Sequence, residues 1–211
     1  MASSDQQTDL RRYLQQARDA VLWKLDGVSE YDARRPLVPT GTNLLGLVKH
    51  LALVEFGYFG DTFGRPFAGP APWDEADPNS DMYAGPEESR DFITGLYRQA
   101  WAHADATIDD LGLDAVGRVP WWPADRAEVT MHHVLVHVIA ETAQHAGHAD
   151  IVRELIDGAA GLAADRPNLP SDDPDWWRAH YDRVERAARE AAGLAADDGP
   201  GPDRGEHGNN S

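Results

Sequence analysis

The chain contains no cysteine among its 211 residues. This absence excludes disulfide bonds, thiolate-ligated zinc or iron–sulfur sites and a cysteine nucleophile. Any thiol chemistry therefore needs a thiol supplied from outside. Basic residues are also scarce, since 19 Lys and Arg stand against 36 Asp and Glu. The formal net charge of −17 argues against a nucleic-acid backbone or an anionic membrane surface as partner.

Long apolar runs are missing too. The longest apolar stretch, residues 44–63, is interrupted by Lys49, His50, Glu55 and Asp61, so it does not read as a membrane span. The N-terminal segment lacks the apolar core of a secretory signal. We therefore expect a cytoplasmic protein, and the length suits a single domain with its own core.

Sustained strand alternation is absent, whereas helical spacing of apolar residues is frequent. Four long helices are expected over about residues 9–25, 43–63, 85–112 and 130–156. A shorter helix, expected over 174–192, carries aromatic residues that would dock it on the bundle. The pattern predicts an all-α four-helix bundle in one domain, 1–192, followed by a disordered polar tail, 193–211.

The connections between these helices are long, at roughly residues 28–41, 65–84 and 113–129, and loops of this length often carry function. They contain aromatic side chains that are poorly suited to full solvent exposure, among them Trp73, Tyr83, Trp121 and Trp122. These four residues are candidates for lining a cofactor or substrate pocket at one end of the bundle. The alternative is that they only cover the core.

Histidines are unusually frequent, and five of the nine fall in the last long helix. Within it, His137, Glu141, His145 and His148 recur at spacings of four, four and three residues, which places them on one stripe. Apolar neighbours suggest that this stripe faces inward. A buried carboxylate flanked by imidazoles is costly unless something compensates it, and a divalent cation does so best.

One helix rarely completes such a site, so a ligand is expected from a facing helix. His50 is the outstanding candidate, because it is the only histidine in the first hundred residues and sits within an apolar helix. Alone it would more often be a core histidine than a ligand. Neither H-E-x-x-H nor paired Glu-x-x-His motifs occur, so a mononuclear site is favoured. Imidazole and carboxylate suit Zn, Ni, Fe or Mn, of which zinc is our first choice.

Two segments, NLLGLVKHLALVE and ETAQHAGHADIVRELIDG, carry a family resemblance. Over roughly residues 8–158 the chain resembles the DinB-like metalloenzymes, and within them the mini-circle protein branch. Many members use three histidines, whereas a histidine, glutamate, histidine set is similar to that of mycothiol-dependent maleylpyruvate isomerases. The resemblance implies His50, Glu141 and His145 as metal ligands. His148 matches a position that is glutamine in many relatives, which implies a place beside the ligands. Related bundles also imply a homodimer.

Three functions fit such a site. The preferred one is an enzyme that transfers a low-molecular-weight thiol, of the mycothiol or bacillithiol type, to an electrophilic small molecule. The second is a hydrolase that uses metal-bound hydroxide, with His148, Glu55 or His137 as the base. The third is a non-catalytic metal-binding stress protein. In either enzyme, His148 and His137 are the candidate catalytic groups beside the metal.

Overall fold

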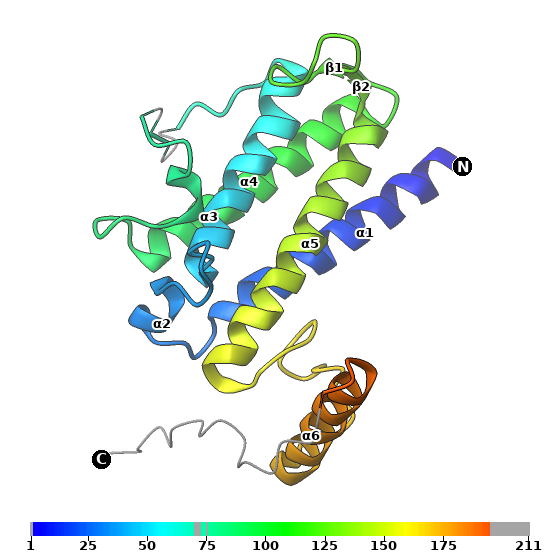
Figure 1. The fold of residues 1–211 in the computed structure, drawn as a ribbon. Helices are drawn as coiled ribbons and strands as arrows, with labels where there is room; N and C mark the ends of the chain where they lie inside the picture. The colour runs from blue at the N-terminus through cyan, green and yellow to red at the C-terminus, as the bar shows by residue number, and fades with distance from the viewer. Residues whose placement is uncertain (1, 70–72, 75, 195–211) are drawn as a thin grey trace. The chain divides into compact units, whose positions relative to one another are not determined.

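The structure is a computed structural model that describes residues 2–69, 73–74 and 76–194. Four long helices form a bundle: α1 (Ala2–Leu22), α3 (Leu44–Glu55), α4 (Arg90–Leu111) and α5 (Met131–Asp157). Helix α1 packs on α5, and α3 packs on both α4 and α5 (Figure 1). The predicted all-α, DinB-like bundle is confirmed.

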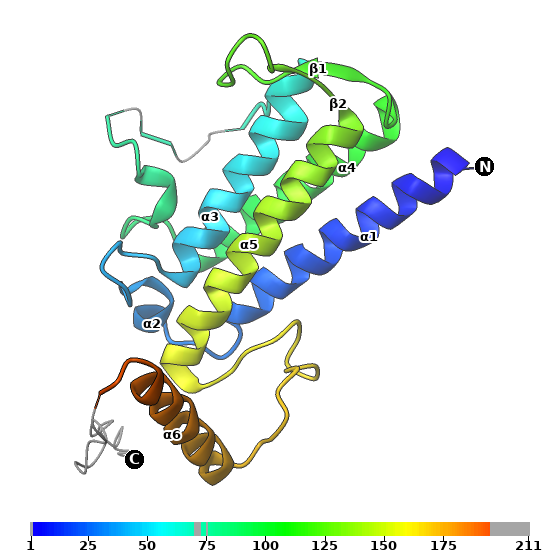
Figure 2. The same ribbon diagram turned by 45° about the vertical axis from the view of Figure 1, so that its right-hand side comes forward.

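Helices α3 and α5 run side by side in opposite directions, as both ribbon views show (Figure 2). Asn43 caps α3, because its side-chain oxygen accepts a hydrogen bond from the Gly46 amide at 2.8 Å. Beyond Glu55 the helical path continues through a π-helical turn, Phe56–Gly60, and a 3₁₀ turn, Asp61–Phe63. It ends at Gly64, which adopts the left-handed conformation with φ +67°. The expected helix over 43–63 is therefore present with a changed pitch near its end.

The core consists of apolar side chains from all four long helices and from the π-helical turn that follows α3. They include Leu14, Val21, Leu47, Leu51, Phe59, Ile93, Leu96, Ile108, Leu135 and Val138, all at most 3% exposed. One ion pair is buried with them: Arg18 Nη2 lies 2.6 Å from Glu55 Oε2. Burial raises the pKa of the Glu55 carboxyl to about 7, although the Arg18 charge opposes this rise.

Helix α4 begins at Arg90 with Ser89 as its cap, so the expected start at residue 85 is wrong. The acid before the cap explains the difference. Glu88 Oε2 accepts hydrogen bonds from the Gly85 amide at 2.7 Å and from Lys49 Nζ at 2.9 Å. Residues 85–88 therefore form a turn tied to α3 instead of the first helical turn.

Several short elements lie inside the long connections, among them one helix and two strands. Helix α2 (Glu30–Arg34) follows α1, and strands β1 (Val116–Arg118) and β2 (Glu128–Thr130) pair antiparallel between α4 and α5. Elements of three to five residues are too short to show a periodic pattern, and none was expected. The strands hold the ends of the segment that carries Trp121 and Trp122.

The chain divides into two compact units, Met1–Asn168 and Leu169–Ser211. The second unit contains α6 (Pro174–Ala191), close to the expected helix and capped by Asp173. Its docking on the bundle within a single domain stays a prediction. Most of the expected tail, 195–211, lies outside the described residues. None of the helices in the described part of the chain has the length and apolarity that crossing a bilayer requires.

Candidate metal centre

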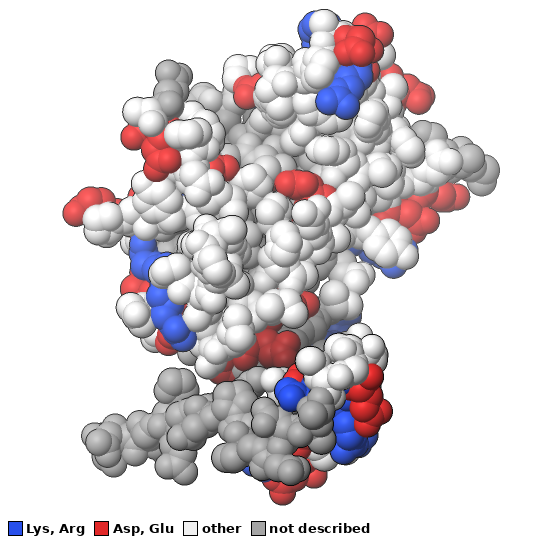
Figure 3. Space-filling model, in the orientation of Figure 1, with Lys and Arg blue, Asp and Glu red and all other residues white. Residues whose placement is uncertain are grey.

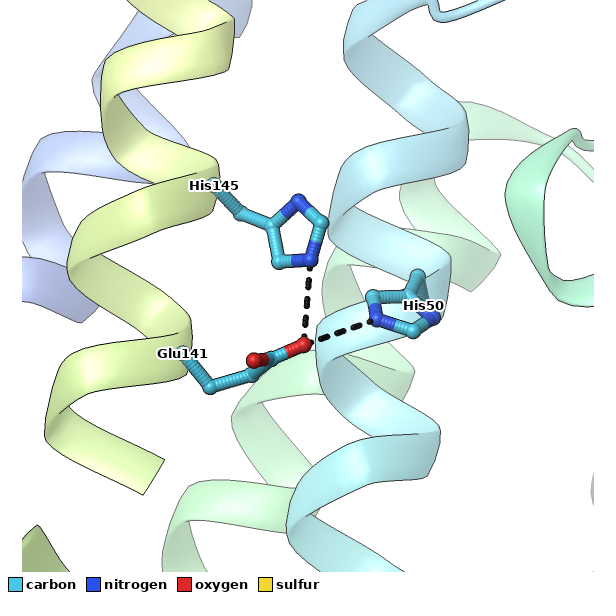
Figure 4. A group of neighbouring side chains, drawn as sticks. All are labelled: His50, Glu141 and His145. Atoms are coloured by element: carbon cyan, nitrogen blue, oxygen red, sulfur yellow. Dashed lines mark hydrogen bonds and ion pairs between the residues drawn. The ribbon is translucent and has the colours of Figure 1, made fainter. Parts of the chain in front are cut away.

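Three predicted ligands meet between α3 and α5 (Figure 4). Helix α3 contributes His50, and α5 contributes Glu141 and His145 one turn apart. Glu141 Oε1 lies 3.2 Å from His145 Nε2 and 3.6 Å from His50 Nε2. The two imidazole rings meet edge to face, with centroids 4.8 Å apart. The local helical spacing and the pairing of the two helices together create the group.

The geometry of this trio fits a divalent cation. Metal bonds of about 2.0–2.1 Å in tetrahedral geometry place neighbouring ligand atoms about 3.3–3.5 Å apart. The two separations from Glu141 Oε1, 3.2 and 3.6 Å, bracket that value. The side chains of His50, Glu141 and His145 are 19%, 29% and 11% exposed, so the site is reachable from solvent. A cation held by these three residues would keep a coordination position open.

The outer nitrogen of each histidine also has a partner. His50 Nδ1 lies 2.7 Å from Asp81 Oδ2, and His145 Nδ1 lies 3.3 Å from His148 Nδ1. When Nδ1–H donates to these partners, Nε2 carries the lone pair that a metal needs. His148 therefore lies beside the predicted ligands, as an exposed residue that contacts His145.

Asp81 was missed by the sequence reasoning. It lies in the 3₁₀ turn Ser80–Met82, in a loop that also contains Asp74 and Asp77. No spacing rule separates one loop aspartate from another. Only the observed contact with His50 singles it out.

The lowered pKa of His145 favours metal ligation at this residue. Burial lowers the pKa of His145, and the neighbouring His50 lowers it further, while Glu141 acts in the opposite direction. The neutral imidazole is therefore favoured, and this is the form that binds a cation.

The predicted aromatic residues separate into different places. Trp122 and His137 meet with ring centroids 5.3 Å apart, and Trp121 meets Tyr58 at 5.1 Å. Tyr83 instead lines a cavity of about 380 Å³ at the start of α3. Trp73 is 48% exposed and joins neither group. Of the four candidates, Trp122 thus meets a histidine of the predicted stripe, and Trp121 joins the same group of rings through Tyr58.

The surface over α3 and α5 carries little charge. In Figure 3 the blue and red side chains gather mostly around the edges of this face, and its centre is white apart from a small acidic patch. An uncharged small molecule can approach such a surface without stripping hydration water from charged side chains.

Fold and site together define a helical bundle with a candidate metal centre of two histidines and one carboxylate. The sequence matches the profile of the mycothiol S-transferase family over residues 9–158, and the chain belongs to this DinB-like family. The predicted resemblance is thereby confirmed. The matched segment runs from α1 to the end of α5 and includes all three candidate ligands. A comparison with curated proteins finds no match.

Proposed function

We propose that this protein is a metal-dependent S-transferase that joins mycothiol, or a similar low-molecular-weight thiol, to an electrophilic small molecule. One observation carries the proposal: two imidazole nitrogens converge on one carboxylate oxygen in a member of the mycothiol S-transferase family. The absence of cysteine agrees with this function, because the chain has no thiol to compete for the metal.

A divalent cation at this site would favour the thiolate form of a bound thiol at neutral pH. The chain supplies the arrangement around it. Glu141 would provide an oxygen donor and the two histidines would provide nitrogen donors. Asp81 orients the His50 ring, and His148 contacts the His145 ring. In the reaction the thiol loses its proton to solvent, a sulfur–carbon bond forms, and the leaving group departs with its electron pair.

Zinc is the metal we propose, because imidazole with one carboxylate and an open position is typical of catalytic zinc. Nickel, iron and manganese accept the same donors. Elemental analysis of protein purified without a histidine tag identifies the metal. Zinc near one equivalent per chain is the expected result.

Turnover assays test the function directly. Protein with and without zinc is mixed with mycothiol and an electrophile, and thiol consumption is followed. We expect turnover only when metal and thiol are both present. Cleavage of esters or amides without thiol would favour a hydrolase, and stoichiometric zinc without any turnover would favour a non-catalytic metal-binding protein.

We predict that His50→Ala and His145→Ala each abolish stoichiometric zinc binding. Each change removes a nitrogen donor, while the apolar core that supports the helices is elsewhere. Zinc content by elemental analysis and helix content by circular dichroism are the measurements. His132→Ala, at an exposed position of α5, is the control and should keep both the zinc content and the helix content of the wild type. Full zinc content in both ligand variants would show that the assignment is wrong.

A further inference from the structure

Four rings form a cluster next to the three candidate metal ligands. Tyr58 contacts Trp121, Trp122 and His137, with ring centroids 5.1, 6.0 and 4.7 Å apart. Trp122 also meets His137 at 5.3 Å, with the ring planes 80° apart. We call Tyr58, Trp121, Trp122 and His137 the aromatic wall. Its rings meet edge to face or tilted, a stable arrangement for aromatic side chains.

The aromatic wall lies along the same seam as the candidate ligands. His137 precedes Glu141 by one turn of α5, about 6 Å along the axis. Tyr58 follows His50 on the helical path that continues α3, about 12 Å along it. Because α3 and α5 are antiparallel, both displacements point toward the same end of the bundle (Figure 1). A molecule reacting at the metal therefore has the aromatic wall on one defined side.

The far edge of the Trp121 indole packs against the helical path that follows α3, and about half of the residue is open to solvent. A Cβ built on Gly57 would lie 2.8 Å from the Trp121 ring, so the ring sits directly on the helix backbone. The residue is nevertheless 51% exposed. Trp122 is fixed from the side, because its Nε1 donates a hydrogen bond to the Tyr58 hydroxyl at 3.2 Å. A supported but uncovered indole offers a ready surface for another flat ring.

We propose that the aromatic wall binds the electrophilic co-substrate and selects flat aromatic electrophiles over small aliphatic ones. The role of the aromatic wall in the reaction rests on the proposed function, because that function places the attacking sulfur beside the three candidate metal ligands. His137 completes the wall as a neutral ring, since burial lowers the pKa of this half-buried histidine despite the nearby Glu141. The centre of this face, which is white apart from a small acidic patch, agrees with a neutral aromatic partner (Figure 3).

Equilibrium binding tests the wall without any turnover. Zinc-loaded wild type, Trp121→Ala and Trp73→Ala are titrated with 2,4-dinitroaniline, a flat ring without a leaving group, by calorimetry. Trp73 is the matched control because it is 48% exposed but is not part of the wall. We expect Trp121→Ala to weaken binding by about 3- to 10-fold, and Trp73→Ala to leave it unchanged. Equal affinity of Trp121→Ala and wild type, or an equal loss in both variants, would overturn the proposal.

Kinetics separate the wall from the transferase function itself. Mycothiol is offered 1-chloro-2,4-dinitrobenzene, which loses chloride when sulfur bonds to its ring, or iodoacetamide, which loses iodide. We expect Trp121→Ala to raise KM for the aromatic electrophile and to leave KM for iodoacetamide unchanged, with Trp121→Phe restoring most of the loss. Equal effects on both electrophiles would overturn the wall. Absence of wild-type turnover with either would instead contradict the proposed function.

Discussion

At the scale of single residues, both candidate histidine ligands have the same arrangement with different outer partners. In each, Nε2 faces Glu141 and Nδ1 faces a neighbour. The neighbour of His50 is the Asp81 carboxylate at 2.7 Å, which is only 15% exposed. The neighbour of His145 is the exposed His148 at 3.3 Å. A shielded carboxylate holds an imidazole more firmly than an exposed imidazole ring does.

This contrast predicts an order of zinc affinities. Asp81→Asn should weaken zinc binding by about 10- to 100-fold, because the carboxylate orients His50 without being a ligand. Glu141→Gln should cost more, since it removes a ligand, and His148→Gln should cost least. Competition titration with a chelating dye measures all three.

Asp77→Asn is the matched control for Asp81→Asn. Asp77 lies in the same loop and accepts a hydrogen bond from the Tyr83 hydroxyl at 2.9 Å. Asp77→Asn should leave zinc affinity unchanged. An equal loss in both loop variants would mean that the loop as a whole, and not Asp81, supports the site. A larger loss in His148→Gln than in Glu141→Gln would exchange their roles.

At the scale of elements, the first turn of α3 holds the segment that carries Asp81. Asn43 caps the helix and also donates a hydrogen bond through Nδ2 to the Met82 carbonyl at 3.2 Å. A Cβ on Gly46 would lie 1.9 Å from that carbonyl oxygen. This backbone approach requires glycine, and it places Asp81 within reach of His50 two helical turns after the cap.

Gly46→Ala should therefore lower both stability and zinc affinity. The added methyl group must displace the Met82 backbone, at a cost of roughly 1–3 kcal/mol in the free energy of unfolding. The displacement also moves Asp81 away from His50. Urea unfolding and zinc competition are the measurements.

Gly95→Ala serves as the control for this change. Gly95 is also inside a helix, but a Cβ there meets nothing within 4 Å. This variant should be neutral or more stable by up to about 1 kcal/mol, because alanine is the better helix former. Equal stability of the two variants would contradict the close-approach argument.

At the scale of the whole molecule, Arg18 and Glu55 connect the helices through the core. Their side chains are 1% and 0% exposed, and Arg18 also reaches Asp105 on α4 at 3.2 Å. The guanidinium lies over the Trp101 ring, 5.5 Å from its centroid. Such a pair is costly to desolvate, so we expect it to define the register of α1, α3 and α4 more than to add stability.

Removing one partner should be strongly destabilising in a pH-dependent manner. Arg18→Met leaves the Glu55 carboxylate buried without its cation, at a cost of about 3–5 kcal/mol. Burial already raises the pKa of Glu55 from 4.5 to about 7, and losing Arg18 raises it further. The native state then binds a proton that the unfolded chain has released, so stability falls as the pH rises above about 4.5.

The deficit of Arg18→Met relative to wild type should therefore be largest well above pH 7. It should shrink as the pH falls toward about 7, below which Glu55 is protonated in both native states. Urea unfolding across this range measures it. The double variant Arg18→Met with Glu55→Leu removes both charges and should recover most of the loss. A deficit that does not change with pH would contradict an unpaired Glu55 as its cause.

The sequence by itself determined the four long helices and the pairing of Glu141 with His145, because both follow from local spacing. Apolar residues at helical intervals define a buried face, and a spacing of four places Glu141 and His145 together. His50 could be named because it is isolated in an apolar helix. These signals extend over one or two helical turns and need no knowledge of distant contacts.

Only the tertiary structure decided which distant segments meet. The partnership of Asp81 with His50, the start of α4 after the Lys49–Glu88 pair, and the separation of Trp121 from Tyr83 all join residues far apart in sequence. Such contacts depend on the paths of long loops, and loop composition does not encode those paths as periodicity encodes a helix. The missing cysteine remains as informative as before: the chain can offer histidine and carboxylate to a metal, and any thiol must arrive as substrate.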